Sequence, residues 1–525
     1  MEQVARLLEH VGLLGADADR VSSLRGAAAA AGPWIEGEGC RVYRRSLRVL
    51  HGVLYCIGAD GSAKYLYAAG ASIPSGFRGQ SMTAGGTRII QAPLSVENAA
   101  ALHELFPFTA PVSLRDRTTT IGCGDRLGLA TPGHLRALAG RQAAPVLAQQ
   151  SVRELTLTGR NFPGVVADAS FLVFQEGYEG GYGADGDHLK NLRDIDSALD
   201  AGMPMITLDL TEVMTPEPSA WTPARVDEAF SSLPAEPRAA VSSRYEGRRF
   251  ELEGASVEIS ATEARRCALM YGKAVEFAAE VDRHLRARRG AAYDLEVSID
   301  ETTAPTLPSH HLYIASELQR RGVAVTSVAP RFVGEFQKGI DYIGDLRAFE
   351  EQFKVHCAIA RSRGGYKVSI HSGSDKFSVY PAIGRHTGMR LHLKTAGTSW
   401  LEAVRVAARL DPALFRRILA AAVDGFAEAS RLYHVAADPA RVPDPSSIPD
   451  TRLEALVEEP NARQVLHIAY GRLLGDPGMR SHLYRFLDAH EEEHYTAVER
   501  HIGRHVRLLG VPGAPVFLDG AGGLR

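Results

Sequence analysis

Short apolar runs alternate with longer amphipathic stretches from about residue 117 to residue 400. Each run is rich in aliphatic or β-branched residues, and each is followed by a stretch whose apolar positions recur with helical spacing. The runs are TTTIG at 118, PVLAQQ at 145, FLVFQEG at 171, MITLDL at 205, DLEVSID at 294, VAVTSVAPRF at 323, KVSIHSG at 367 and MRLHLKT at 389. About eight strands with helices between them predict an α/β fold, a (β/α)8 TIM-type barrel.

Two further regions flank the predicted barrel. Residues 1–112 begin with an amphipathic helix and continue with short strands and glycine-rich turns, which predicts a separate N-terminal α+β lobe. The barrel is assigned to residues 113–400, with a Pro-rich insertion at about 211–260 between its fourth and fifth strands. Residues 401–525 are predicted to form a C-terminal helical extension that completes the barrel.

A doubly wound open sheet is the competing fold. Such a sheet usually carries a glycine-rich phosphate loop after its first strand. Here the first strand is followed by GCGDRLGLATPGH, which matches neither GxGxxG nor GxxxxGK(S/T). The barrel is therefore the favoured fold.

Composition narrows the class of protein. Hydrophobic residues make up 45% and charged residues 23% of the 525 residues, as in globular proteins. The net charge of −3 disfavours a nucleic acid partner, and without an apolar run of about 18 residues we expect no membrane partner. The five cysteines lack CxxC spacing and the N-terminus lacks a signal-peptide pattern, so we expect a cytoplasmic protein. The sequence leaves open whether the protein forms a homo-oligomer.

Polar residues gather where the predicted strands end, which is where barrel enzymes place their active sites. The third strand leads to Asp187 and His188 in the glycine-rich YGADGDHLK, which could also be an Asx turn with a helix cap. In the fifth strand, the two-residue period puts Glu296, Ser298 and Asp300 on one face. The other strand ends carry Asp125, Arg126, Asp209, Arg331, Glu335, Gln337, Lys338, His371, Asp375, Lys376 and Lys394.

Two histidines from different strand ends, His188 and His371, are placed to converge on one divalent cation. Nitrogen ligands together with oxygen ligands suit Mn, Co, Ni or Zn. As alternatives, His371 is a core histidine and Glu296 is a salt-bridged residue of the barrel interior. Their common position at strand ends favours a metal site, and a catalytic role for Glu296.

The motif HEEEH at 490–494 formally matches the zinc-protease pattern HExxH. It lies in a predicted long C-terminal helix whose apolar stripe includes Leu487, Val498 and Ile502. We therefore expect His490 and His494 on the solvated face of that helix. A metalloprotease is disfavoured.

Several long strings resemble the tagaturonate/fructuronate epimerases. They are GDRLGLATPGH, AQQSVRE, GADGDHLK, EVSIDET, KGIDYIGDL, YKVSIHSGSDKFSVYP and LHLKTAGTSWLEAV. The resemblance runs from about residue 117 into the C-terminal helices and is weakest in the N-terminal lobe. It implies a metal-dependent hexuronate epimerase that interconverts D-tagaturonate and D-fructuronate.

The same resemblance implies roles for single residues. Asp187 is the implied proton acceptor and Glu296 the implied proton donor, while His188 and His371 are implied metal ligands. Gln337 stands where family members often have Glu. Its side-chain oxygen is an implied metal ligand without charge.

The two uronates differ at a carbon β to the ketone, so simple enolisation does not invert it. Transient oxidation would need a nicotinamide, for which no dinucleotide loop is visible. The remaining route is retro-aldol cleavage, followed by rotation of the aldehyde and recondensation. In this route Asp187 is the base, Glu296 is the acid and the metal is a Lewis acid. Burial inside the barrel is expected to raise the pKa of Glu296, which suits a proton donor.

The expected partner is a sugar or a sugar acid. Arg126, Arg331, Lys338 and Lys376 are the candidates for binding a substrate carboxylate. A C4-epimerase of the neutral ketohexoses fructose and tagatose is an alternative, because the neutral glutamine departs from the family pattern. Two further alternatives are a barrel glycosidase, which would use the same two carboxylates, and a sugar-binding scaffold protein.

Overall fold

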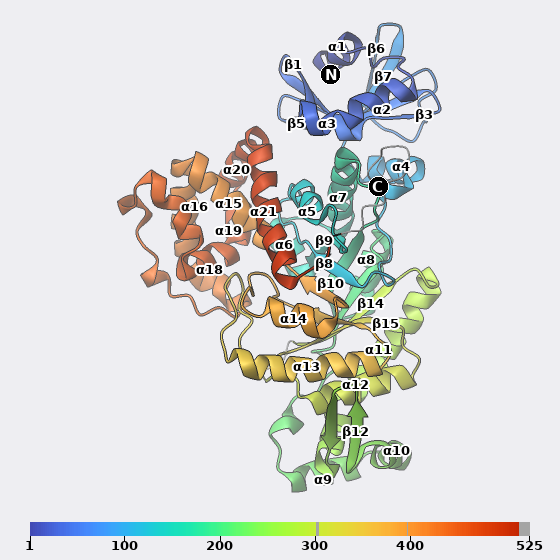
Figure 1. Cartoon of the computed structure of the whole chain (residues 1–525), viewed down its shortest axis with the longest axis vertical. Coiled ribbons are helices and arrows are strands. Elements are labelled where there is room, and N and C mark those ends of the chain that lie inside the picture. Colours follow the sequence, from blue (N-terminus) through green and yellow to red (C-terminus); the bar gives the residue numbers. More distant parts are fainter. Residues whose placement is uncertain (301–303, 396, 514–525) are drawn as a thin grey trace.

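Eight parallel strands close into a barrel at the centre of the molecule (Figure 1). The structure, a computed structural model, describes residues 1–300, 304–395 and 397–513. The strands are β8 (Thr119–Gly122), β9 (Ala144–Ser151), β10 (Gly183–Leu189), β11 (Met205–Asp209), β14 (Asp294–Ile299), β15 (Val325–Pro330), β16 (Lys367–Ile370) and β17 (Leu391–Lys394). The ring closes where β17 pairs with β8, with Leu391 opposite Thr119. The predicted barrel is confirmed, because a doubly wound open sheet would leave two strand edges unpaired.

The third strand does not lie at residue 171. FLVFQEG ends the helix α7 (Phe162–Glu176), and the strand is β10, in the glycine-rich segment that was expected to follow the strand. α7 is capped by Asn161, whose side chain accepts from the Gly164 N–H, and by Gly177 at a φ of 61°. It is buried on most sides between the barrel and the N-terminal sheet, so its apolar positions lack a one-sided helical period.

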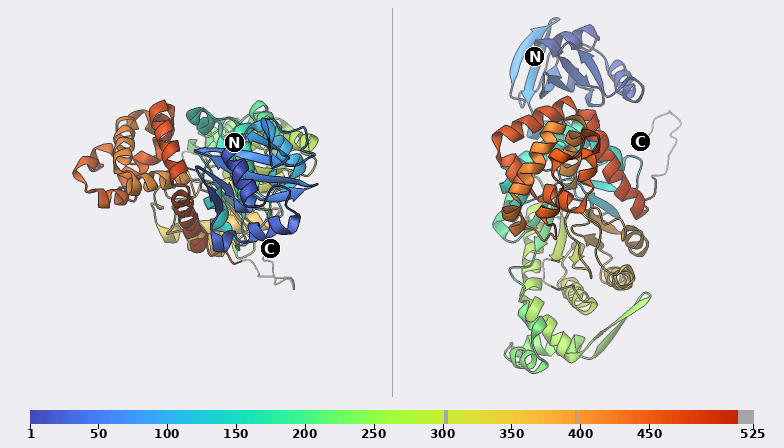
Figure 2. Two further views of the ribbon diagram at one scale, coloured as in Figure 1. Left: turned by 90° about the horizontal axis from the view of Figure 1, so that it is seen from above. Right: turned by 90° about the vertical axis from the view of Figure 1, so that its left-hand side faces the viewer.

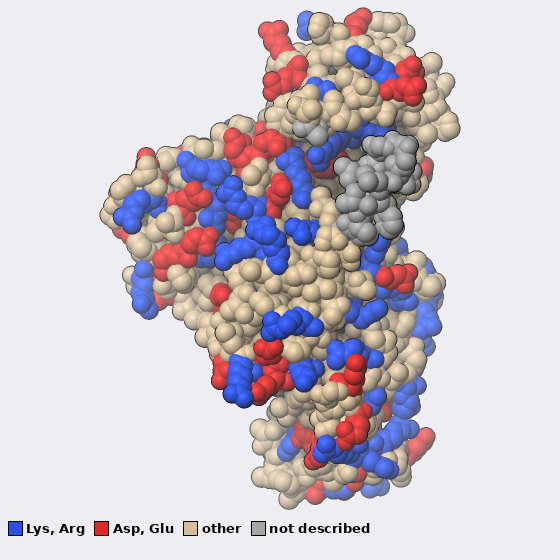
Figure 3. Space-filling model, in the orientation of Figure 1, with Lys and Arg blue, Asp and Glu red and all other residues tan. Residues whose placement is uncertain are grey.

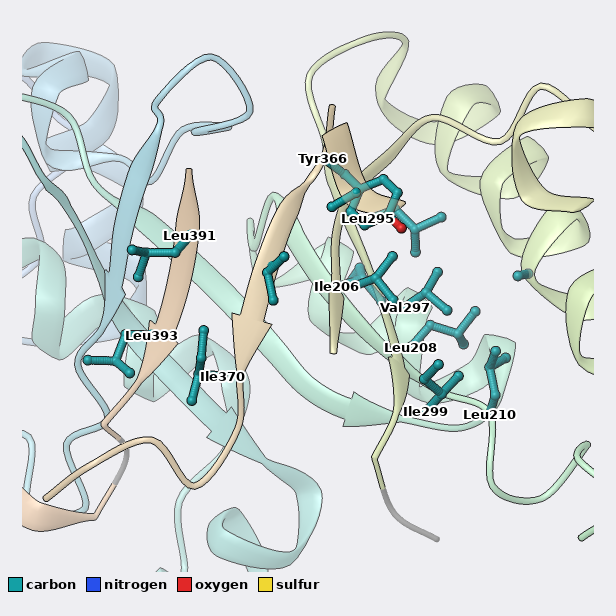
Figure 4. Close-up of a cluster of buried hydrophobic side chains, with 14 of the residues drawn as sticks. Ile206, Leu208, Leu210, Leu295, Val297, Ile299, Tyr366, Ile370, Leu391 and Leu393 are labelled. Atoms are coloured by element: carbon teal, nitrogen blue, oxygen red, sulfur yellow. The ribbon is translucent and has the colours of Figure 1, made fainter. Parts of the chain in front are cut away.

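The strands alternate between an outer apolar face and an inner polar face. In β14, Leu295, Val297 and Ile299 belong to the buried apolar cluster that Figure 4 shows beside the barrel strands. Glu296 lies between them in sequence and hydrogen-bonds to Ser327 of β15 inside the barrel. Apolar packing on one face thereby leaves the other face of the strand to polar groups.

A seven-stranded sheet in residues 34–93 lies at one end of the molecule (Figures 1 and 2). Its strands are β1 (Trp34–Gly37), β2 (Cys40–Tyr43), β3 (Arg48–Leu50), β4 (Val53–Asp60), β5 (Ala63–Ala69), β6 (Gln80–Ala84) and β7 (Thr87–Pro93). Arg41 and Lys64 from this sheet both pair with Glu491 at the start of α21 (Glu491–Leu509). These ion pairs tie the sheet to the C-terminal helices.

The segment between β11 and β14 forms an arm at the opposite end of the molecule (Figure 1). The expected Pro-rich insertion at 211–260 contains α9 (Pro223–Ser231), α10 (Ala235–Tyr245) and the hairpin of β12 (Arg248–Leu252) and β13 (Ala255–Ile259). The chain returns to the barrel through α11 (Ala261–Arg289).

Helices follow β17 and cover one side of the barrel (Figure 2). They include α15 (Thr398–Leu410), α16 (Pro412–Asp424), α18 (Pro460–Ile468), α19 (Tyr470–Gly475), α20 (Pro477–Ala489) and α21. Residues 514–525 of the predicted extension lie outside the described residues. The long helix expected around His490 is two helices, because α20 ends before His490 and α21 begins after it. His494 and Glu491 are buried and not on a solvated face, because α21 packs against α5 (Thr131–Leu138) and Glu491 pairs with the N-terminal sheet.

The surface carries both signs of charge. Figure 3 shows lysine and arginine interspersed with aspartate and glutamate over one face of the molecule. All five cysteines are buried and unpaired. Within the described ranges, no helix combines the length and the apolar character needed to cross a membrane.

Candidate active site

Two cavities that share lining residues open at the carboxyl ends of the barrel strands. The inner cavity, of about 50 Å³, is lined by Asp187, His188 and Lys394 together with residues of the β16 end. The outer cavity has a volume of about 720 Å³. Asp300 and His371 line both, so the two cavities form one site.

Asp187 and His188 are consecutive residues of β10, yet their side chains meet. Successive residues of a regular strand point to opposite faces. His188 has a φ of 55°, in the left-handed region, and the pairing of β10 with β11 shifts register between Gly186 and Leu189. The irregularity brings His188 Nδ1 to 2.9 Å from Asp187 Oδ1. Such backbone strain at a non-glycine residue is typical of functional sites.

His188, Asp300 and His371 form a group whose ligand atoms all lie within 4.8 Å of one another. The centroids of the two imidazole rings are 4.8 Å apart. His371 Nδ1 lies 3.0 Å from Asp300 Oδ1, but it is buried and makes no hydrogen bond among the described residues. A ring nitrogen and a carboxylate oxygen that face each other in this way fit a divalent cation such as Mn, Co, Ni or Zn.

Gln337 lies outside this group. Its side-chain oxygen accepts hydrogen bonds from the Ala436 N–H at 2.9 Å and from Gln464 Nε2 at 3.2 Å, so it anchors the loop after β15 to the C-terminal region. The carboxylate beside the two histidines is Asp300. The sequence places Asp300 on the inner face of the fifth strand, but the predicted ligand set followed the family resemblance and left it out.

The ammonium of Lys394 lies among three carboxylates. Lys394 Nζ is 3.0 Å from Glu296 Oε1 and 3.2 Å from Asp185 Oδ2, and it also donates to Asp187 Oδ1. Its fourth contact is with Thr207 Oγ1, at 2.6 Å. Neither Lys394 nor Asp185 was assigned a role from the sequence. The available signal was that Asp185 lies in GADGDHLK and Lys394 in LHLKTAGTSWLEAV, two of the strings that carry the family resemblance.

The pKa of Glu296 is lowered, contrary to the expectation from burial. Burial raises the pKa of this carboxyl, but the Lys394 ammonium and His371 outweigh burial and hold it well below its usual range. Burial dominates at Asp185, whose pKa is raised to about 6 despite Lys394. The charges around Glu296 therefore favour its ionised form, whereas burial favours the protonated form of Asp185.

Protein contacts hold the charged groups of Lys376 and Arg126, which were candidates for carboxylate binding. Lys376 Nζ donates to three backbone carbonyl oxygens, the farthest at 2.9 Å. Arg126 lines the inner cavity, pairs with Glu154 at 3.1 Å and lies 3.6 Å above the ring of Tyr470. Their positive charges thus already have protein partners, and Lys376 uses all of its donors.

The other two candidates border the open volume. Lys338 lines both cavities and Arg331 lines the outer one. The structure adds Arg153, at the start of α6 (Val152–Thr158), which also lines both cavities. It lies in AQQSVRE, one of the strings that carry the family resemblance, but no role was assigned to it from the sequence.

Comparisons with known proteins agree with the fold. A family model described as tagaturonate epimerase matches residues 43–509. The chain is 41% identical over 478 residues to a tagaturonate/fructuronate epimerase of Thermotoga maritima, an alignment that covers 90% of this chain and 98% of that protein. The native crystal structure of fructuronate-tagaturonate epimerase UxaE from Cohnella laeviribosi has a TM-score of 0.86 and 42% identity, covering 94% of this chain and 100% of its own. A glycerol complex of the same enzyme matches at 41% identity with the same TM-score and coverage. The chain therefore belongs to the tagaturonate epimerase family.

Proposed function

We propose that this protein interconverts D-tagaturonate and D-fructuronate in the two adjoining cavities, with Asp187 as base and Glu296 as acid. Family membership supports the reaction. The observation that supports the site is that each of these carboxylates contacts a histidine of the candidate metal group, His188 or His371. Asp187 lines the inner cavity together with the proposed ligands, and Glu296 is joined to that cavity through His371.

His188, His371 and Asp300 would hold the divalent cation. When bound, the cation would supply a Lewis acid that polarises the substrate ketone. The buried Nδ1 of His371, which makes no hydrogen bond to a described residue, supports this assignment. The pairing of the opposite ring nitrogen with Glu296 supports it further, since ligand histidines commonly donate to a carboxylate.

Asp187 is placed to take the proton from the hydroxyl on the carbon to be inverted. Its removal allows the bond between that carbon and the carbon beside the ketone to break, which gives an aldehyde and an enediolate. The aldehyde turns, the bond re-forms on its other face, and Glu296 gives a proton to the resulting alkoxide oxygen, which becomes the new hydroxyl. The two adjoining cavities keep both fragments close to Asp187, which lines the inner one.

Lys338 and Arg153 are proposed to meet the substrate carboxylate, because both line the inner and the outer cavity. Lys376 is less suited to this task, because its ammonium already donates to three carbonyl oxygens. Arg331, at the outer cavity, is placed to attract an anion entering the site.

The proposal is tested by an activity panel after chelation and add-back of Mn, Co, Ni or Zn. Turnover of tagaturonate and fructuronate that depends on the added metal supports it. Turnover of fructose and tagatose at equal efficiency would favour the neutral-ketohexose alternative. Hydrolysis of glycosides that survives chelation would favour a glycosidase, and binding of sugars without any turnover would favour a scaffold protein.

A further inference from the structure

Lys394 connects the two carboxylates that the proposed function uses. Its ammonium donates to Asp187 Oδ1 on one side and lies 3.0 Å from Glu296 Oε1 on the other. The side chain is 4% exposed and ends at the lining of the inner cavity. No described hydrogen bond joins His371, the other basic partner of Glu296, to Asp187.

An epimerase with one base and one acid does not return to its starting state by chemistry alone. After each turnover Asp187 holds the proton taken from the substrate, and Glu296 has lost the proton that it gave. The side chains of Glu296 and Lys394 are 0% and 4% exposed, which leaves little access for a proton from bulk water. Lys394, which contacts both carboxylates, offers a path inside the protein.

We propose, resting on the proposed function, that Lys394 is the proton relay that resets the site between turnovers. The Lys394 ammonium gives one proton to the Glu296 carboxylate and accepts the proton held by Asp187. The two transfers leave Lys394 as an ammonium, Glu296 as an acid and Asp187 as a carboxylate. The same path run backwards serves the reverse epimerisation.

The four contacts of Lys394 suit such an exchange. Thr207 Oγ1 accepts from Lys394 at 2.6 Å and lies 3.3 Å from Glu296 Oε1. The ammonium therefore stays hydrogen-bonded while a proton moves to Glu296, and Asp185 Oδ2 at 3.2 Å balances its charge. A lysine ammonium can give up and regain a proton, whereas an arginine guanidinium stays protonated in proteins. An arginine at this position could therefore not act as a relay.

The variant Lys394→Arg keeps the positive charge and removes the exchange. After rapid mixing with tagaturonate, we expect one product per site at close to the wild-type rate, followed by a steady state slower by about 10²- to 10⁴-fold, the span of one proton-transfer group. The wild-type enzyme should show no such burst. A wild-type-like steady state, or a first turnover as slow as the later ones, would overturn the relay.

Lys367→Arg is the matched control. Lys367 is another buried barrel lysine, but its ammonium donates to the Leu114 carbonyl at 3.0 Å and makes no described hydrogen bond to Asp187 or Glu296. It should turn over at the wild-type rate without a burst. Equal losses in both arginine variants would mean that any bulkier group in the barrel slows the enzyme, and would overturn the relay.

If Lys394→Arg does not fold, Lys394→Ala with added methylamine or ethylamine takes its place. We expect amines to restore the steady-state rate to an extent that depends on the pKa of the amine. Rescue without such dependence, or no rescue in a folded variant, would overturn the relay. A wild-type enzyme that does not epimerise tagaturonate would instead refute the proposed function itself, and this inference with it.

Discussion

His371 Nε2 lies 2.7 Å from Glu296 Oε1, inside the barrel. The same relationship recurs across the cavity, where His188 Nδ1 lies 2.9 Å from Asp187 Oδ1. A ligand histidine that donates its second ring N–H to a carboxylate has a fixed tautomer and a fixed ring orientation. Each proposed acid–base group is thus oriented by a proposed metal ligand.

Removing a ligand should release the metal while the fold is kept. We expect His188→Ala, His371→Ala and Asp300→Asn to lose metal by elemental analysis, with an unchanged circular dichroism spectrum. Gln337→Ala should keep its metal, because the Gln337 side-chain oxygen is held by Ala436 and Gln464. Full occupancy in one of the first three variants would remove that residue from the ligand set.

The control for metal content is His490→Ala. His490 lies between α20 and α21, away from both cavities. Metal content should therefore not change. A loss there would reopen the interpretation of HEEEH as a metal motif.

Removing either proposed acid–base group should slow epimerisation by about 10²- to 10⁴-fold, the usual contribution of one such group. The test variants are Asp187→Asn and Glu296→Gln, assayed with tagaturonate. Glu296→Gln should keep its metal, because an amide oxygen can still accept from His371 Nε2. A Glu296→Gln enzyme that binds metal and turns over at the wild-type rate would exclude Glu296 as the donor.

Retro-aldol chemistry should leave the hydrogen on the inverted carbon in place, because the aldehyde retains it. The reaction is run in D2O and that position is read by NMR. Deuterium that enters at each turnover would show deprotonation at this carbon. With substrate deuterated there, a large primary isotope effect would instead indicate hydride transfer.

Lys338→Ala should raise KM for the uronates by about 10-fold or more and lower kcat little, because it removes an ion pair to a part of the substrate that does not react. Any weak turnover of fructose should not change. Lys376→Met is the comparison, and we expect it to reduce stability more than uronate binding, because Lys376 holds three backbone carbonyls. Reversed effects would exchange the roles of the two lysines.

Buried histidines of α21 should make the fold sensitive to acid. Burial lowers the pKa of His494 and His501 from 6.5 to about 4, although Asp125 and Glu402 oppose this at His494 and Asp375 at His501. Above pH 6.5 both histidines are neutral in either state, so the fold has its full stability. As the pH falls from 6.5 towards 4, the unfolded chain binds protons that the folded chain excludes, and stability drops.

This loss should approach about 1.4 kcal/mol per pH unit for each histidine. It is measured as the free energy of unfolding in urea between pH 7 and pH 5. His494→Gln should have a shallower slope than the wild type over that range. An equal slope would show that His494 does not contribute.

Much of the barrel could be read from the chain, because seven of its strands are apolar runs of the kind that a closed parallel barrel buries on its outer face. The third strand could not be predicted from the sequence. The glycines of β10 conceal its strand character, and they are needed for packing: a Cβ at Gly186 would meet Leu189 at 2.8 Å and Ala198 at 2.9 Å. That steric limit comes from neighbours in space.

The sequence by itself also placed Asp187, His188, Glu296 and His371 at strand ends, and strand ends of a parallel barrel share one rim. Only the tertiary structure decided which of their neighbours complete the site. Lys394 reaches Asp187 across 207 residues of chain, and it helps to lower the pKa of Glu296 beside it. Contacts at such separation depend on how the ring of strands closes, and local pattern carries no record of that closure.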